Sequence, residues 1–271
     1  MESMKMMQQG FPTPRTRRRA ACLTILLAIA VVPVACTQNQ RPQSFDKHNF
    51  TGTWDRYPQA LDTQRDPTVS QVPMQIPPPP LKPKYLGHYQ ANQKRIEEAD
   101  ARGEPIATGY THCLPDGMPA MMMAMFPMEV LQTPGQITII QEAFNQVRRI
   151  YLDAVVPAIE DAEPGFCGHS AARWEGDVLV VETVGIKDIV RMRNVPHSAQ
   201  MRIQERIRVL GPDSFENEVT VIDPEYLTGP WSWTWSYQRK VDYKMYEYVC
   251  EDNREFADPA TGATRLRIKE R

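Results

Sequence analysis

Hydrophobic and polar residues alternate with a period of two through most of the chain after Gln136. This period is typical of β-strands that bury one face, and short turn sequences interrupt it at close intervals. We therefore expect a series of strand pairs joined by tight turns. The predicted pairs are 137–142 with 147–152, 172–174 with 178–183, 201–210 with 214–222, and 231–239 with 243–250.

A long series of neighbouring strands removes its unpaired edges most easily by closing into a barrel. With one more strand predicted at 50–54, we expect roughly eight to ten strands. Residues 84–102 contain no proline and end at Gly103, which predicts one helix. The expected fold is mainly β: an antiparallel up-and-down, lipocalin-like barrel with one helix.

The first segment carries five cations, Lys5 and four arginines at 15 and 17–19, ahead of an uncharged apolar run at 20–35. This order is typical of a signal peptide, and the run is shorter than a membrane-spanning helix. We divide the chain into a signal peptide at 1–35, a polar tether at 36–48 and one barrel domain at 49–271. Proline-rich residues 55–83 are expected to form an extended surface strap.

Removal of residues 1–35 changes the formal net charge from −2 to −6. An acidic domain does not suit nucleic acid, so no nucleic-acid partner is expected. Export places the mature chain in the periplasm or on the outer membrane. Val34-Ala35-Cys36 resembles a bacterial lipobox, although Pro33 stands where that motif usually has leucine. Lipidation of Cys36 and ordinary cleavage nearby both stay open.

Three cysteines belong to the mature domain, and an oxidising compartment favours pairing of two of them. Cys113 and Cys250 stand at the ends of predicted regular segments, whereas Cys167 lies in a glycine-rich loop. We predict a disulfide between Cys113 and Cys250.

Two sequence resemblances concern the fold. Gly52-Thr53-Trp54 resembles the Gly-x-Trp signature of lipocalins. Six longer strings resemble a large family of exported bacterial proteins, mostly described as hypothetical, which implies the barrel and the compartment but no chemistry. The strings are Cys113-Leu114-Pro115 with Gly117-Met118-Pro119, Gln132-Thr133-Pro134-Gly135-Gln136, Arg148-Arg149-Ile150-Tyr151-Leu152, Gly168-His169-Ser170, Trp174-Glu175-Gly176-Asp177 and Glu247-Tyr248-Val249-Cys250-Glu251.

Two histidines stand in loops that successive hairpins would bring to one mouth of the barrel. His169 follows Gly168, and His197 lies between Pro196 and Ser198. Because imidazole transfers protons near neutral pH, the pair is our candidate for general base and general acid. The alternative is that each imidazole holds its loop through a backbone hydrogen bond.

Charged and aromatic residues within the strands are candidates for ligand binding. One of Arg148 and Arg149 points inward unless the register contains a bulge, and Arg149 is our candidate ligand-binding residue. Glu182 and Glu205 interrupt apolar runs, so an arginine and a carboxylate would orient a ligand or form a plain salt bridge. The aromatic candidates are Trp174 and Trp233, and the alternate aromatic residues at 231–237 suit a ligand face or simple core packing.

A methionine-dense stretch, 118–128, lies beside His112 and Cys113. Thioether, imidazole and thiolate ligands suit Cu(I), so copper binding is one hypothesis. We rank first an exported barrel that binds a small apolar or aromatic molecule, with cofactor-free lyase, isomerase or dehydratase activity left open. A non-catalytic binding or scaffolding lipoprotein is the second hypothesis. No cofactor is predicted, and the phosphate-loop, serine-hydrolase elbow and zinc-protease motifs do not occur in the sequence.

Overall fold

The computed structural model describes residues 45–58, 76–104, 112–124 and 126–250, together with the backbone of 255–257 and 264–266. All of them belong to one unit, residues 44–271. The predicted signal peptide, Cys36, tether residues 36–44 and strap residues 59–75 lie outside the described residues. Within the described part of the chain, no helix has the length and apolar character needed to cross a bilayer.

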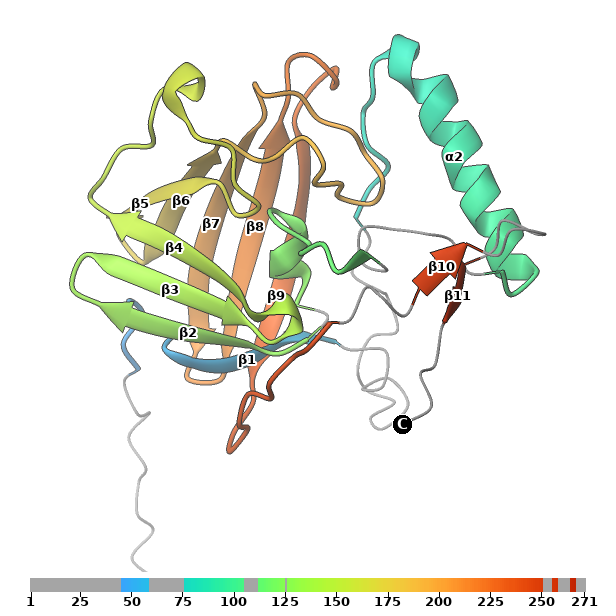
Figure 1. Ribbon diagram of the computed structural model, residues 1–271. Helices are drawn as coiled ribbons and strands as arrows, with labels where there is room; N and C mark the ends of the chain where they lie inside the picture. The colour runs from blue at the N-terminus through green and yellow to red at the C-terminus, as the bar shows by residue number, and fades with distance from the viewer. Residues whose placement is uncertain are drawn as a thin grey trace, which may run out of the picture. The chain divides into compact units, whose positions relative to one another are not determined.

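Nine strands form a closed barrel, in which each strand pairs with the next along the chain and the last pairs with the first (Figure 1). The closed lipocalin-like barrel expected from the alternating pattern is confirmed. The strands are β1 (Gly52–Tyr57), β2 (Met128–Thr133), β3 (Gln136–Gln141), β4 (Gln146–Leu152), β5 (His169–Glu175), β6 (Val178–Val184), β7 (Arg202–Gly211), β8 (Ser214–Ile222) and β9 (Trp231–Arg239). Two short strands, β10 (Glu255–Ala257) and β11 (Thr264–Leu266), pair separately.

One pair of strands departs from the antiparallel arrangement. β4 and β5 run parallel, with Ile150 opposite Ser170, while all other neighbours in the barrel are antiparallel. Antiparallel neighbours alternate in direction, and an odd number of strands cannot alternate around a closed ring. Nine strands therefore require at least one parallel pair, and β4–β5 supplies it. Residues 153–168 make the connection and include a 3₁₀ turn at Ile159–Asp161.

The predicted helix is confirmed as α2 (Pro83–Ala101). Pro83 occupies the first turn, where its missing N–H costs no hydrogen bond. The helix ends before Gly103, whose φ of 66° is the left-handed conformation that glycine adopts readily. Two further 3₁₀ turns lie at Ala120–Met123 and Ala143–Asn145.

Two sequence-based assignments differ from the structure. β2 was not predicted, although Pro134-Gly135 is a type II turn signature that would have revealed the β2–β3 hairpin. Conversely, the predicted strand at 243–250 is wrong, because this segment contains no strand. Both edges of β9 are already occupied by β8 and β1, so no backbone edge is left for another strand.

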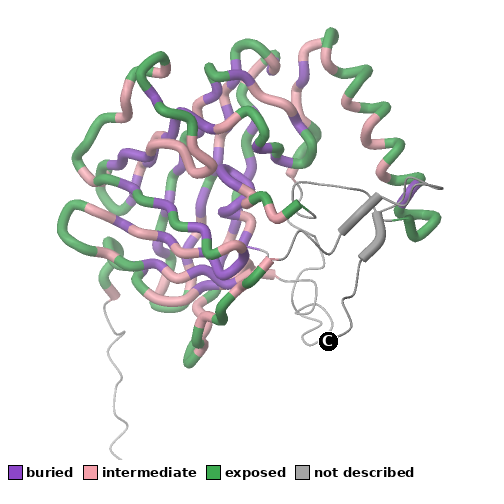
Figure 2. The backbone as a smooth tube through the Cα atoms, viewed as in Figure 1, coloured by how far each residue is buried: buried purple, intermediate pink, exposed green. Residues whose placement is uncertain are grey.

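The inner face of the barrel is the hydrophobic core. Buried and exposed residues alternate along the strands, as Figure 2 shows. Trp231, Trp233, Trp235 and Tyr237 all point inward from β9 and are buried. Trp233 packs edge-to-face against both of its tryptophan neighbours, with ring centroids 4.8 and 5.3 Å apart. The aromatic side chains of β9 therefore pack mainly in the core.

Trp54 closes one region of the core through contacts that require a glycine nearby. Its indole N–H donates to the carbonyl oxygen of Phe50 at 2.8 Å, and the Arg239 guanidinium lies 4.3 Å from its ring centroid. A Cβ on Gly52 would meet the Arg239 Nη1 atom at 2.1 Å. Gly52 thus leaves room for the arginine that covers Trp54, which explains the spacing of the Gly-x-Trp triplet in physical terms.

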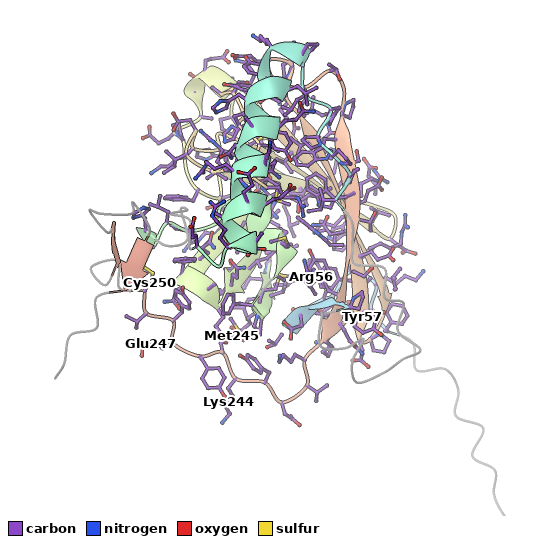
Figure 3. The ribbon with its side chains drawn as sticks, turned by 90° about the vertical axis from the view of Figure 1, so that its right-hand side faces the viewer. Arg56, Tyr57, Lys244, Met245, Glu247 and Cys250 are labelled. Carbon is purple, nitrogen blue, oxygen red and sulfur yellow. A yellow bond between two sulfur atoms is a disulfide. The ribbon has the colours of Figure 1, made fainter. Side chains whose placement is uncertain are left out.

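A disulfide joins Cys113 to Cys250, as predicted, and Cys167 is free. The disulfide lies at the end of an extended segment that leads from β9 to Cys250. Figure 3 shows Lys244, Met245 and Glu247 along this segment. Side-chain contacts hold this segment to the barrel: the Tyr243 hydroxyl donates to Glu142 Oε2 at 2.7 Å. The segment from β9 to Cys250 is therefore held by side-chain contacts along its length and by a covalent bond at its end.

We expect replacement of both bonded cysteines by serine to lower the free energy of unfolding by about 2–5 kcal/mol, because the bond closes a long loop. Cysteines 113 and 250 are 137 residues apart in sequence. Chemical denaturation measures the loss, and Cys167→Ala is the control with a smaller effect. Peptide mapping without reductant that links Cys167 to either partner would contradict the assignment.

Candidate functional site

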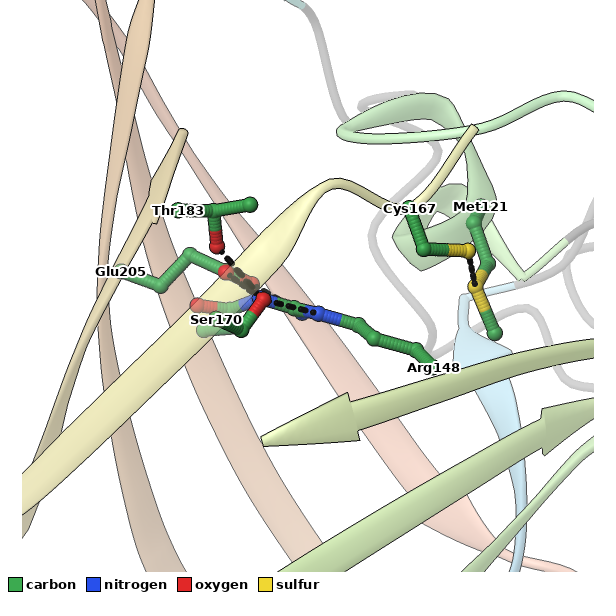
Figure 4. A network of polar contacts seen from close by, with 7 residues as sticks. Met121, Arg148, Cys167, Ser170, Thr183 and Glu205 are labelled. Atoms are coloured by element: carbon green, nitrogen blue, oxygen red, sulfur yellow. Dashed lines mark hydrogen bonds and ion pairs between the residues drawn. The ribbon is translucent and has the colours of Figure 1, made fainter. Parts of the chain in front are cut away.

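A buried ion pair occupies the centre of the barrel. Arg148 of β4 and Glu205 of β7 have fully buried side chains, and the guanidinium donates two hydrogen bonds to the carboxylate. The bond from Arg148 Nη1 to Glu205 Oε1 measures 3.1 Å. This bidentate geometry is the strongest form of an arginine–carboxylate contact. Figure 4 shows the pair spanning the interior.

Hydroxyl and amide groups from intervening strands complete the network. Arg148 Nε donates to Ser170 Oγ at 3.2 Å, and Arg148 Nη2 donates to Thr183 Oγ1 at 3.1 Å. Asn217 Nδ2 donates to Glu205 Oε1 at 2.8 Å. Each of the five successive strands β4 to β8 thus contributes one polar side chain. The network places a paired charge and its hydrogen-bond partners inside the barrel.

The ligand-binding residues predicted from the sequence divide between the two faces of the sheet. Glu205 lies inside, but Arg149 is exposed on the outer face and Arg148 takes the inward position. Glu182 also faces outward, where Arg202 donates to it at 2.6 Å. The inward arginine is thus Arg148 and not the candidate Arg149, and the alternation in β4 did not indicate which parity was buried.

The two predicted tryptophans lie away from any common cavity. Trp174 is half-buried, and its ring centroid lies 4.3 Å from that of His48. Trp233 is enclosed between Trp231 and Trp235. Neither residue lines the pockets described below, so their described contacts are those of packing residues.

An apolar pocket lies at the barrel mouth, where the end of β8, the start of β9 and the loop before β7 meet. It contains about 340 Å³ of space between the lining atoms, counting the part open to solvent, of which about 20 Å³ admits a water-sized sphere. Apolar side chains make up most of its wall. The lining residues are Met118, Pro119, Val190, Met192, Val195, Pro196, His197, Met201, Val221, Asp223, Leu227 and Trp231.

The polar groups of this pocket are already engaged. Asp223 accepts hydrogen bonds from the backbone N–H and the hydroxyl of Ser198, at 2.6 and 2.9 Å. It also accepts from the backbone N–H groups of Glu225 and Tyr226. Three of these donors bond to Oδ1 and one to Oδ2, so Asp223 acts as a clasp between the loop before β7 and the bend after β8.

His197 faces carbonyl oxygens at both ring nitrogens. Nδ1 lies 3.0 Å from the oxygen of Ser198, and Nε2 lies 3.0 Å from the oxygen of Lys187. His169 Nε2 lies 2.8 Å from the oxygen of Glu163. The two imidazoles do not hydrogen-bond to each other, and both make the backbone contacts of the structural alternative. Both ring nitrogens of His197 therefore lie within hydrogen-bonding distance of a backbone oxygen.

The methionine-dense stretch is largely core. Met118, Met121, Met122 and Met128 are fully buried, and Met125 lies outside the described residues. Cys113 is bonded to Cys250, so its sulfur is not available as a thiolate ligand. In the described part of the chain, no group of three histidine, cysteine or acidic side chains is placed to hold a metal ion.

Cys167 lies beside this methionine cluster, with its Sγ 3.8 Å from Met121 Sδ (Figure 4). Burial raises the pKa of the Cys167 thiol, and the nearby Arg148 charge acts in the opposite direction. A raised thiol pKa favours the neutral form, which is the unreactive form of cysteine.

The sequence did not predict several residues of the Arg148–Glu205 network and of the apolar pocket. Ser170, Thr183 and Asn217 all lie at inward positions of period-two strands, and that parity was the available signal. The pocket wall formed by residues 190–195 was not predicted, because an irregular loop carries no periodic signal.

The comparisons with known proteins add no relative. No protein-family model, no curated protein and no solved structure matches this chain.

We expect Arg148→Met to lower the free energy of unfolding by about 3–5 kcal/mol, because it leaves the Glu205 carboxylate buried without its partner. Arg149→Met, the same change one residue later on the exposed face, should cost less than about 0.5 kcal/mol. Urea denaturation followed by tryptophan fluorescence compares the two. Equal losses would show that the ion pair is not the interior contact described here.

Asp116 provides a prediction for pH dependence. Burial raises its pKa from 3.8 to about 6. Because the pKa is raised in the folded state, the contribution of Asp116 to the free energy of unfolding is fully present below about pH 4 and is lost as the pH rises through 6. Because the side chain is partly exposed, we expect Asp116→Asn to gain only about 1–2 kcal/mol at pH 8 and little at pH 3.5. The exposed Asp188→Asn is the control, and an equal gain at both pH values would refute the assignment.

Proposed function

We propose that this chain is an exported envelope protein that binds a small apolar or aromatic molecule at the mouth of its barrel, without catalysis by its histidines. The observation that carries the proposal is the pocket that Met118, Met192, Met201 and Trp231 help to line. Small-molecule sites are typically apolar hollows with few polar groups.

The composition of the wall supports an uncharged ligand. Of the pocket's polar residues, Asp223 already accepts four hydrogen bonds and His197 faces two carbonyl oxygens. An anionic ligand would lose its hydration there beside a carboxylate, and no lysine or arginine lines the pocket to pair with it. Apolar or aromatic molecules lose nothing comparable and gain from contact with the indole and the thioethers.

The pocket is narrow, and its methionines bear on the size of the ligand. The side chains leave free space for about one water molecule. Methionine has three rotatable bonds and adapts to irregular shapes, so Met192 and Met201 are the residues that would move aside. A ligand of one or two rings is the size that such a rearrangement would admit.

The envelope location rests on the sequence and on the disulfide. The basic segment and apolar run at 1–35 support export, with Cys36 as an acylation site. A disulfide between Cys113 and Cys250 is typical of an oxidising compartment. The strings shared with exported barrel proteins support the same location, and we propose that the chain belongs with them.

The buried ion pair favours binding at the mouth over a deep cup. Arg148, Glu205 and Asn217 are buried inside the barrel, and Asn217 stands opposite Trp235 of β9. A ligand in that part of the interior would have to displace a paired charge, which is costly. The pocket wall requires only movement of apolar side chains.

The test uses N-phenyl-1-naphthylamine, an uncharged aromatic probe whose fluorescence rises when it leaves water. We expect saturable binding to the full-length chain and binding weaker by about tenfold for Val195→Phe, because the larger ring fills the pocket. Val155→Phe makes the same change at a residue that is 91% exposed and should bind as the unaltered chain does.

Thermal unfolding of each variant checks that the fold is retained. Probe binding that is absent, or that is equal in Val195→Phe and Val155→Phe, would refute the proposal. Mass spectrometry of the mature chain from an envelope fraction tests export and acylation of Cys36 independently.

A further inference from the structure

A second hollow lies outside the barrel, between α2 and the loop at 191–196. About 390 Å³ of this hollow admits a water-sized sphere, against about 20 Å³ in the apolar pocket. Five of its lining residues come from the first half of α2 and three from the loop. They are Lys84, Tyr85, His88, Tyr89 and Asn92 of the helix, with Arg191, Asn194 and Pro196 of the loop. We call this hollow the basic groove.

The loop that forms one wall of the basic groove has two chemically different faces. Val190, Met192 and Val195 are buried and face the apolar pocket. Arg191 and Asn194 are exposed and face the basic groove. A single stretch of backbone thus separates an apolar hollow from a polar one.

Positive charge dominates the basic groove. Lys84 and Arg191 line it, and no carboxylate is among its described lining residues. Glu225 accepts a hydrogen bond from the Tyr85 hydroxyl at 3.3 Å beside the groove. The described lining of the groove therefore carries two cations and no anion, which favours an anionic ligand.

The guanidinium of Arg191 is held in place without being neutralised. Its Nη1 donates to the backbone oxygens of Asp188 and Val190, the second at 2.9 Å. Within the described residues Arg191 forms no ion pair, and its remaining N–H groups have no acceptor. A positioned guanidinium with free donors suits a bidentate contact with an oxyanion.

Contacts at several points hold α2 against the barrel, so the basic groove has a fixed width. Tyr85 stacks on Tyr226 with ring centroids 4.0 Å apart. Lys82 Nζ donates to the Pro224 oxygen at 2.6 Å, and Asn194 Nδ2 donates to Gln93 Oε1 at 3.2 Å. These contacts join the first turn and the middle of the helix to the barrel loops.

We propose that the basic groove binds a small phosphate ester whose body carries hydroxyl groups. Lys84 and Arg191 contact the phosphate, for which arginine supplies a planar fork and lysine a point charge. The amides of Asn92 and Asn194 and the Tyr89 hydroxyl hydrogen-bond to the hydroxyl groups of the ligand. This ligand differs in charge from that of the apolar pocket, so the two proposals fail independently.

The experiment titrates the full-length chain with glycerol 3-phosphate and with dihexanoyl phosphatidylglycerol below its micelle concentration, using calorimetry. The two probes share a glycerol phosphate unit and differ in acyl chains, and glycerol is the neutral control. The variants are Lys84→Glu and Arg191→Gln, both at exposed positions. Lys94→Gln removes a charge from the same helix outside the groove.

We expect saturable binding of at least one phosphate probe, weakened about tenfold by Lys84→Glu or Arg191→Gln and within about twofold of the unaltered chain in Lys94→Gln. Raising the salt concentration should weaken binding as well, because an exposed ionic contact is screened. Binding of glycerol 3-phosphate supports a soluble ligand, and binding of the lipid probe alone supports a lipid headgroup.

Two results would overturn the proposal. The first is that neither phosphate probe binds more tightly than glycerol. The second is that binding in Lys84→Glu and Arg191→Gln equals binding in Lys94→Gln, which would place the ligand elsewhere. Circular dichroism of each variant confirms that a loss of affinity is not a loss of fold.

Discussion

The buried pairing of Arg148 with Glu205 constrains the rest of the barrel. Moving two charges out of water costs more than their attraction returns unless other groups complete their hydrogen bonds. Ser170, Thr183 and Asn217 do so from three different strands. A slip of one residue in β4 would bring Arg149 inward in place of Arg148 and turn the buried Ile150 to the outer face. The network therefore joins one side chain from each of five neighbouring strands, β4 to β8, in a single set of contacts.

The odd number of strands imposes a second constraint, because a closed barrel of nine strands requires at least one parallel pair of neighbours. The parallel contact between β4 and β5 covers only three residue pairs, from Ile150 opposite Ser170 to Leu152 opposite Ala172. The connection before β5 packs beside the start of the methionine cluster, where the Met118 N–H donates to the Phe166 oxygen at 2.9 Å. Polar side chains occupy the interior around Arg148 and Glu205, and the two pockets described above are lined by loop residues. The candidate sites are accordingly at the mouth and on its outer side.

Much of the fold follows from local sequence signals, and the remainder depends on long-range contacts. Period-two alternation located most of the strands, and the proline-free stretch before Gly103 located α2. The cysteine positions indicated the disulfide correctly. Alternation alone does not distinguish Arg148 from Arg149, because both parities of β4 contain apolar residues. The segment 243–250 has strand-like composition but meets a sheet with no free edge. The walls of both pockets include loop 190–196, whose shape is set by tertiary contacts such as the Asp223 clasp.

The two-faced loop has a thermodynamic consequence. Met192 and Arg191 are adjacent in one backbone, so a guest that displaces the thioether also shifts the guanidinium. If occupancy on one side moved this backbone, it would alter affinity on the other, and the coupling free energy would be identical in both directions. A partition only one residue thick would in this way make the interior of the molecule responsive to what collects on its surface.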